Sequence, residues 1–153
     1  MKKYILILLL LIFPASTYYA SNNISKPKKP KYTAKDIYIV ASVIWNESRG
    51  ESHYGKCAVA SVIYNRSEGD VSKFSKVIRQ DDWLGKPYEE IKIYDSMSEE
   101  IKLAKYMFDN KFSPISNYTH FYNPKISNPD WKYDLINKKK IGNHVFGKIK
   151  LDL

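Results

Sequence analysis

Two neighbouring stretches of this chain place apolar residues three and four positions apart, and a glycine, Gly50, separates them. In the first stretch these residues are Ile37, Val40, Ala41 and Ile44. In the second they are Cys57, Ala60 and Tyr64, with Val59, Val62 and Ile63 beside them. This spacing puts the apolar side chains on one face of an α-helix. The small Ala, Ser and Cys side chains of the second stretch imply that two helices approach each other closely, so we expect a mainly α core.

Start and stop signals mark the ends of the expected helices. Thr33 and Asp36 have the form of a capping box, and so do Ser96 and Glu99. Gly69 stops the second apolar stretch. The helices are expected at residues 33–47, 57–66, 71–80 and 96–110, with a loop at 81–95.

Beyond Pro114 the pattern changes to short aromatic and β-branched pieces at 118–122 and 145–146. Prolines and a glycine separate these pieces. We expect them to form a small β-hairpin or an irregular lobe that covers one side of the helices. The predicted fold class is therefore mainly α (α+β), in a single domain, since 153 residues are about what one domain holds.

The first twenty residues have the three parts of a secretory signal: Lys2 and Lys3, an apolar run at 4–13 and a small-residue exit at 14–20. The apolar run is shorter than the roughly 20 residues that a membrane span needs. The predicted segments are a signal peptide (1–20), a flexible linker (21–32) and a catalytic domain (33–153). We expect a protein that is secreted or held in the periplasm or cell envelope; the alternative is a membrane tether, if the signal is not cleaved.

The formal net charge of +9 indicates which partners suit the chain. For an exported protein these are anionic wall polymers or a membrane surface, although a merely solubilising surface explains the charge equally well. No nucleic-acid-binding motif occurs, so we expect no nucleic-acid partner, and we expect a monomer.

Cys57 is the only cysteine and cannot form an intramolecular disulfide. We interpret it as a small core residue, because no base is evident near it.

Residues 45–51, WNESRGE, place Glu47 where the first helical pattern breaks off at glycine. A glutamic acid at the end of a packed helix, partly removed from water, keeps its proton to higher pH and can donate it to a leaving oxygen. This favours cleavage of a glycosidic bond. The alternative is that Glu47 simply ends the helix and pairs with Arg49.

Three blocks of sequence resemble one protein family. Residues 44–51, IWNESRGE, continue at 55–66 as GKCAVASVIYNR, followed by THFYNP at 119–124 and IGNHVF at 141–146. These blocks resemble, in the same order, the core of the spore-cortex-lytic, SleB/CwlJ-like cell wall hydrolases. The resemblance covers roughly residues 36–147.

The resemblance implies a lysozyme-like fold that cleaves peptidoglycan glycan strands between N-acetylmuramic acid and N-acetylglucosamine, without metal or other cofactor. It also implies that Glu47 is the catalytic acid. Only one carboxyl group is convincingly placed, which favours a lytic transglycosylase: the 6-hydroxyl of muramic acid attacks, and one glutamate serves first as acid and then as base. The alternatives are a lysozyme-type hydrolase with a second carboxylate, for which Glu51 is the candidate, and a peptidoglycan-binding module without turnover.

Further residues are candidates for contact with the substrate. Tyr122 and Asn123 suit sugars, since an aromatic face stacks on a pyranose ring and an amide both donates and accepts hydrogen bonds; a strand end followed by a turn at Pro124 is the alternative. Glu51 and His144 complete the predicted substrate-binding set, although His144 also fits a hydrogen-bonded structural histidine. Trp83 and Trp131 suit either a glycan groove or packing. The three histidines, His53, His120 and His144, are not at metal-ligand spacing.

Overall fold

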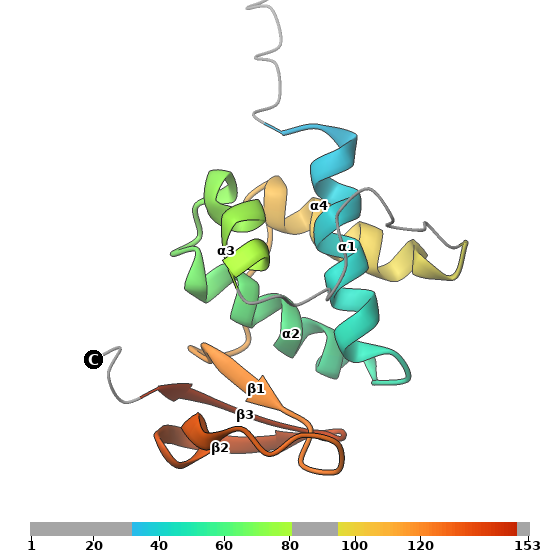
Figure 1. The fold of residues 1–153 in the computed structure, drawn as a ribbon. Helices are drawn as coiled ribbons and strands as arrows, with labels where there is room; N and C mark the ends of the chain where they lie inside the picture. Colours follow the sequence, from blue (N-terminus) through green and yellow to red (C-terminus); the bar gives the residue numbers. More distant parts are fainter. Residues whose placement is uncertain (1–31, 81–94, 150–153) are drawn as a thin grey trace, which may run out of the picture.

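The computed structural model describes residues 32–80 and 95–149. The predicted signal peptide, the predicted linker except Tyr32, the predicted loop except Asp95, and Trp83 lie outside the described residues. Figure 1 shows a layer of helices with a small sheet against one end of it. Within the described ranges no helix is long and apolar enough to cross a membrane.

Four α-helices form the larger layer. They are α1 (Ala34–Ser48), α2 (His53–Arg66), α3 (Phe74–Gln80) and α4 (Ser98–Phe108). Single turns of 3-10 helix, Val71–Lys73 and Asp95–Met97, precede α3 and α4. The four predicted helices are confirmed, although α2 begins one turn earlier than its apolar pattern indicated.

The two predicted capping boxes had different outcomes. At the start of α1 the Thr33 hydroxyl accepts a hydrogen bond from the backbone N–H of Asp36, and the Asp36 carboxylate accepts one from the N–H of Thr33. The box predicted at Ser96 is wrong, because α4 is capped by Met97 without a side-chain hydrogen bond. The Glu99 carboxylate that would have closed it binds His53 and Lys56 on α2 instead.

The core extends through all four helices to the sheet, and the facing sides of α1 and α2 form one part of it. Val40 and Ala41 of α1 and Val59 and Ala60 of α2 are fully buried, in agreement with the close approach that the small residues predicted. Burying one Val side chain contributes roughly 1.5–3 kcal/mol, so this contact is a main source of stability in a chain without disulfides.

Cys57 is partly buried and packs against the core, as expected. The expectation that no base lies near it is wrong, because the His53 Nε2 atom is 3.4 Å from its sulfur, one helical turn away. Burial and the charge of Glu99 raise the pKa of the thiol, so it stays protonated.

A three-stranded antiparallel sheet takes the place of the predicted hairpin or irregular lobe. Its strands are β1 (His120–Tyr122), β2 (Leu135–Ile141) and β3 (His144–Ile149), in the order β1-β3-β2. The sequence indicated parts of β1 and β3 but not β2. This strand does not alternate, because a bulge between Ile136 and Lys139 shifts its register, and Asn137 there has a φ of 54°.

Aromatic packing and hydrogen bonds attach the sheet to the helices. Phe146 of β3 is 1% exposed, and its ring lies 5.5 Å from that of Tyr118 and 5.2 Å from that of Phe121. From α2, Asn65 donates hydrogen bonds of 2.8 Å to the carbonyls of Ser116 and Tyr118, just before β1. These contacts hold the start of β1 against the carboxyl-terminal end of α2.

Candidate functional site

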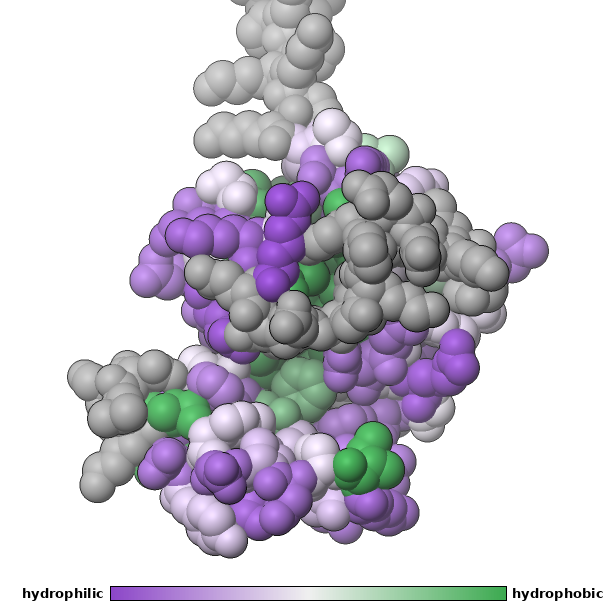
Figure 2. Space-filling view, in the orientation of Figure 1, coloured by the Kyte–Doolittle hydropathy of each residue, from purple (hydrophilic) through white to green (hydrophobic). Residues whose placement is uncertain are grey.

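A pocket of about 610 Å³ lies between the helical layer and the sheet. Figure 2 shows a mostly hydrophilic face, with apolar surface exposed where the helices meet the sheet. The residues that line the pocket are Glu47, Val62, Arg66, Thr119, His120, Phe121, Tyr122, Asn123, Ile126, Ser127, Pro129, Trp131 and His144. They come from α1, α2, β1, β3 and the segment between β1 and β2, so the pocket exists only once the two layers have packed.

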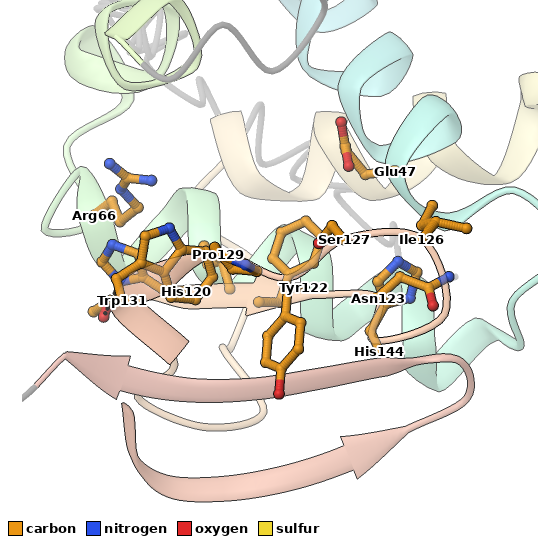
Figure 3. A pocket seen from close by; sticks show the side chains of 13 residues that line it. Glu47, Arg66, His120, Tyr122, Asn123, Ile126, Ser127, Pro129, Trp131 and His144 are labelled. Carbon is orange, nitrogen blue, oxygen red and sulfur yellow. Dashed lines mark hydrogen bonds between the residues drawn. The ribbon is translucent and has the colours of Figure 1, made fainter. Parts of the chain in front are cut away.

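Glu47 lines the pocket from the last turn of α1, on the helical side (Figure 3). Its side chain is half-buried, and this burial raises the pKa of its carboxyl group. Gly50, with a φ of 80°, turns the chain directly after the helix and leaves Glu47 at its end. Arg49, the alternative partner, lies over the Trp45 ring, with its Cζ atom 5.4 Å from the ring centroid. Glu47 thus has the partly desolvated carboxyl that the sequence predicted.

Asn123 and Tyr122 both line the pocket, on the sheet side. The Asn123 side-chain oxygen accepts a hydrogen bond of 3.0 Å from the N–H of Lys125, which is the turn expected before Pro124. Its backbone carbonyl accepts hydrogen bonds from the N–H groups of Ile126 and Ser127. Asn123 therefore shapes a loop that brings two further residues into the pocket.

One end of the pocket combines aromatic rings with a cation. The Trp131 ring lies 5.3 Å from that of His120 and meets that of Tyr122 edge-on at 5.9 Å. Figure 3 shows Arg66 at this same end, away from Glu47. Of the two interpretations of Trp131, the structure supports a position in the groove. Aromatic faces next to a guanidinium group suit a sugar that carries an anionic substituent.

Glu51 does not line the pocket. Its side chain is only 6% exposed, and its Oε1 atom accepts hydrogen bonds of 3.0 Å from both the backbone N–H and the side-chain amide of Asn143. Burial alone would raise the pKa of Glu51, but the hydrogen bonds from Asn143 and the nearby His144 together lower it. The carboxylate is thus ionised and joins the start of α2 to the turn between β2 and β3.

His144 begins β3 and is the link between Glu51 and the pocket. Its Nδ1 atom lies 3.3 Å from Oε1 of Glu51, while its ring forms part of the pocket lining. Burial lowers the pKa of His144, and the Glu51 carboxylate opposes this effect without reversing it. The imidazole is therefore neutral at pH 7.

The structure thus brings Glu47, Tyr122, Asn123, His144 and Trp131 together and leaves Glu51 behind them. Sequence reasoning missed Arg66 and His120, although both stand inside the blocks that carry the family resemblance. Ile126 and Ser127 had no signal of their own, because they reach the pocket through the turn at Asn123. Among residues 32–80 and 95–149, no three His, Cys, Asp or Glu side chains gather in a way that could hold a metal ion.

Comparison with known proteins places these features in context. A family model described as cell wall hydrolase matches residues 33–147. A spore cortex-lytic enzyme of Bacillus cereus is 30% identical over 120 residues, which cover 76% of this chain and 46% of that enzyme. The chain therefore spans less than half the length of this curated relative.

Two solved structures have a similar fold. The catalytic domain of the Bacillus cereus SleB protein superposes with a TM-score of 0.61 at 30% identity, covering 76% of this chain and 92% of that domain. The catalytic domain of the germination-specific lytic transglycosylase SleB from Bacillus anthracis gives 0.51 at 28% identity, covering 77% and 98%. The predicted fold class, a mainly α, lysozyme-like α+β domain, is confirmed.

Proposed function

The chain belongs to the cell wall hydrolase family, and from this premise we propose that it cleaves peptidoglycan glycan strands as a lytic transglycosylase with Glu47 as its catalytic acid. The observation that carries the proposal is the half-buried Glu47 carboxyl, whose pKa is raised by burial and which lines a pocket of about 610 Å³. A carboxyl with a raised pKa keeps its proton to higher pH than an exposed one and can give it to a leaving oxygen.

The proposed reaction needs one carboxyl group. Glu47 protonates the oxygen between N-acetylmuramic acid and N-acetylglucosamine, and the bond from that oxygen to the muramic anomeric carbon breaks. The 6-hydroxyl of the same muramic acid then bonds to the anomeric carbon and gives its proton to the Glu47 carboxylate. The products are a 1,6-anhydromuramic end and a free 4-hydroxyl, and Glu47 regains its starting state.

The composition of the pocket favours this route over hydrolysis. Glycosidases that use water or an enzyme nucleophile need a second carboxyl group, at about 5–10 Å from the first. Among the described residues that line the pocket, Glu47 is the only one with a carboxyl group. The hydrolytic candidate, Glu51, is held by Asn143 at the turn between β2 and β3 and does not line the pocket.

The rest of the pocket suits the same polymer. The rings of Trp131, His120 and Tyr122 offer faces for pyranose rings, and Arg66 offers a positive charge for carboxylates of the muramic acid or its peptide. Export through the signal at residues 1–20, a monomeric state and attraction to anionic wall polymers remain parts of the proposal. They rest on the sequence alone.

Glu47→Gln tests the proposal, with Glu68→Gln as the matched control because Glu68 pairs with Lys73 on the surface, outside the pocket. The first variant is expected to lose lysis of purified sacculi while keeping its fold, and the second to lyse at the wild-type rate. Mass spectrometry of wild-type products should find 1,6-anhydromuramic ends. Reducing muramic ends would indicate hydrolysis, and full activity of Glu47→Gln would refute the role of Glu47. Binding of sacculi without lysis by the wild type would identify a non-catalytic module.

A further inference from the structure

Glu51 is a firmly held carboxylate that touches the pocket-lining His144 but does not line the pocket itself. Its oxygens lie under the two-residue turn Gly142-Asn143 and receive both N–H groups of Asn143. Gly142 has a φ of 56°, and a Cβ atom on it would overlap Oε2 and lie 2.6 Å from Cδ of Glu51. The turn therefore fits closely around this carboxylate and fixes where it lies.

The ring of His144 lies between that carboxylate and the pocket. Its Nδ1 atom is 3.3 Å from Glu51 Oε1. The rings of Phe121 and Phe146 lie 5.4 Å and 6.1 Å from it, the first edge-on, which restricts rotation of the imidazole. In an imidazole Nε2 lies across the ring from the side that Nδ1 faces. Figure 3 shows His144 beside Asn123 on the sheet side of the pocket, with Glu47 on the helical side.

The charge states of the two groups decide which nitrogen carries the proton. The lowered pKa values of Glu51 and His144 leave a carboxylate next to a neutral imidazole at pH 7. A carboxylate only accepts hydrogen bonds, so a hydrogen bond across this 3.3 Å contact has Nδ1 of the imidazole as its donor. The single proton of the neutral ring is then on Nδ1, and Nε2 carries a lone pair.

We propose that Glu51 is a positioning residue that holds His144 as the Nδ1–H tautomer, so that Nε2 accepts a hydrogen bond from a hydroxyl group of the bound glycan. This inference rests on the proposed function, since it concerns a sugar bound across from Glu47. It assigns Glu51 a role through His144 in place of direct contact with substrate. In this proposal His144 is both a hydrogen-bonded structural histidine and a contact for the substrate, the two interpretations that the sequence offered.

The chain contains a matched control for this pair. His53 and Glu99 also form a His–Glu contact, with Nδ1 2.6 Å from Oε1, but neither residue lines the pocket. His53→Gln therefore removes a similar pair without touching the site. Glu51→Gln and His144→Gln are conservative changes, because glutamine keeps an oxygen for the N–H groups of Asn143 in the first case and a polar side chain at the start of β3 in the second.

The first measurement is the tautomer of His144, by ¹⁵N NMR of the full chain without substrate. The wild type should show Nδ1–H as the main form, and Glu51→Gln should shift the population toward Nε2–H. The second is lysis of sacculi. Both single variants and the double variant should lose about tenfold in kcat/KM, mostly through a higher KM, and His53→Gln should keep wild-type kinetics.

Three results would overturn the inference. A wild-type His144 found as Nε2–H, or wild-type kinetics for His144→Gln, would overturn it. So would a Glu51→Gln variant that lowers only the melting temperature, because the pair would then serve the fold alone.

A failure of the proposed function looks different. If Glu47→Gln still lyses sacculi, the acid is wrong, while the tautomer of His144 is unaffected. A titration of the wild-type chain with an oligomer of β-1,4-linked N-acetylglucosamine, which lacks the muramic acid of the proposed cleavage point, then tests the contact apart from turnover. The His144 Nε2 resonance should move on binding, and an unmoved resonance in the saturated complex would overturn the inference.

Discussion

Replacing Gly142 by alanine is the sharpest test of how the sheet is joined to the helices. Gly142 is the first residue of the two-residue turn between β2 and β3, and its φ of 56° is in the left-handed region. A positive φ at the first turn position is typical of a type II′ hairpin, where glycine is favoured. An alanine there costs roughly 1–2 kcal/mol for the backbone alone.

The second part of the cost comes from Glu51. The new Cβ would overlap Oε2, so the carboxylate must move and at least one hydrogen bond from Asn143 is lost. A hydrogen bond to a charged group contributes roughly 1.5–3 kcal/mol. The expected loss for Gly142→Ala is therefore about 3–4 kcal/mol, or on the order of 12 °C in melting temperature for a domain of this size.

Gly50→Ala is the matched control. Gly50 also has a positive φ, 80°, but a Cβ on it would meet nothing within 4 Å. Its replacement should cost only the backbone part, about 1–2 kcal/mol. Thermal unfolding followed by circular dichroism gives both values.

A double-mutant cycle with Glu51→Ala isolates the contact. Without the Glu51 carboxylate the overlap disappears, so Gly142→Ala in that background should cost no more than Gly50→Ala does in the wild type. Equal costs for the two glycine variants in the wild type would refute the reasoning. So would a cost of Gly142→Ala that does not change when Glu51 is removed.

Two further predictions concern the pocket. Because burial raises the pKa of Glu47, ionisation costs the folded state stability, and this cost is present above the folded pKa and absent below the unfolded value of 4.5. Glu47→Gln should therefore melt at a higher temperature than the wild type near neutral pH and lose this advantage in acid. Calorimetry at several pH values measures both melting temperatures. If the difference between them did not depend on pH, ionisation of the buried carboxyl would not be the cause of the higher stability. Arg66→Gln should raise KM for sacculi about tenfold, as expected for the loss of one charged hydrogen bond. Arg79 is exposed on α3 and does not line the pocket, so Arg79→Gln should leave KM unchanged. An unchanged KM for Arg66→Gln would mean that the cation does not meet the polymer.

The helices could be predicted because their signals are local. The apolar spacing in α1 and α2 and the capping box at Thr33 involve residues within one or two turns of each other. The capping box predicted at Ser96 does not form, because the contact that decides it is not local in the sequence. Glu99 had a partner available on another helix, and no local pattern shows that His53 and Lys56 end up beside it.

Residues of the site could be predicted where a short motif marks them, but their contacts could not be predicted where packing of distant segments creates them. Glu47, Tyr122 and Asn123 were identified from their own short motifs. The sequence could not place Glu51, because its partner Asn143 is 92 residues away and the contact exists only after the sheet packs on the helices. β2 was missed because its exposed central residues and its bulge remove the alternation that marks a strand.

The position of β2 at the edge of the sheet has a consequence for the behaviour of the protein at high concentration. Within residues 32–80 and 95–149 no strand pairs with its outer edge, to which a strand from another molecule could add. Lys138, Lys139 and Lys140 are all exposed there, and the bulge bends the strand. A second copy approaching edge to edge would bring its own three lysines against these, so like charges and a bent template keep the molecules from joining into extended sheets.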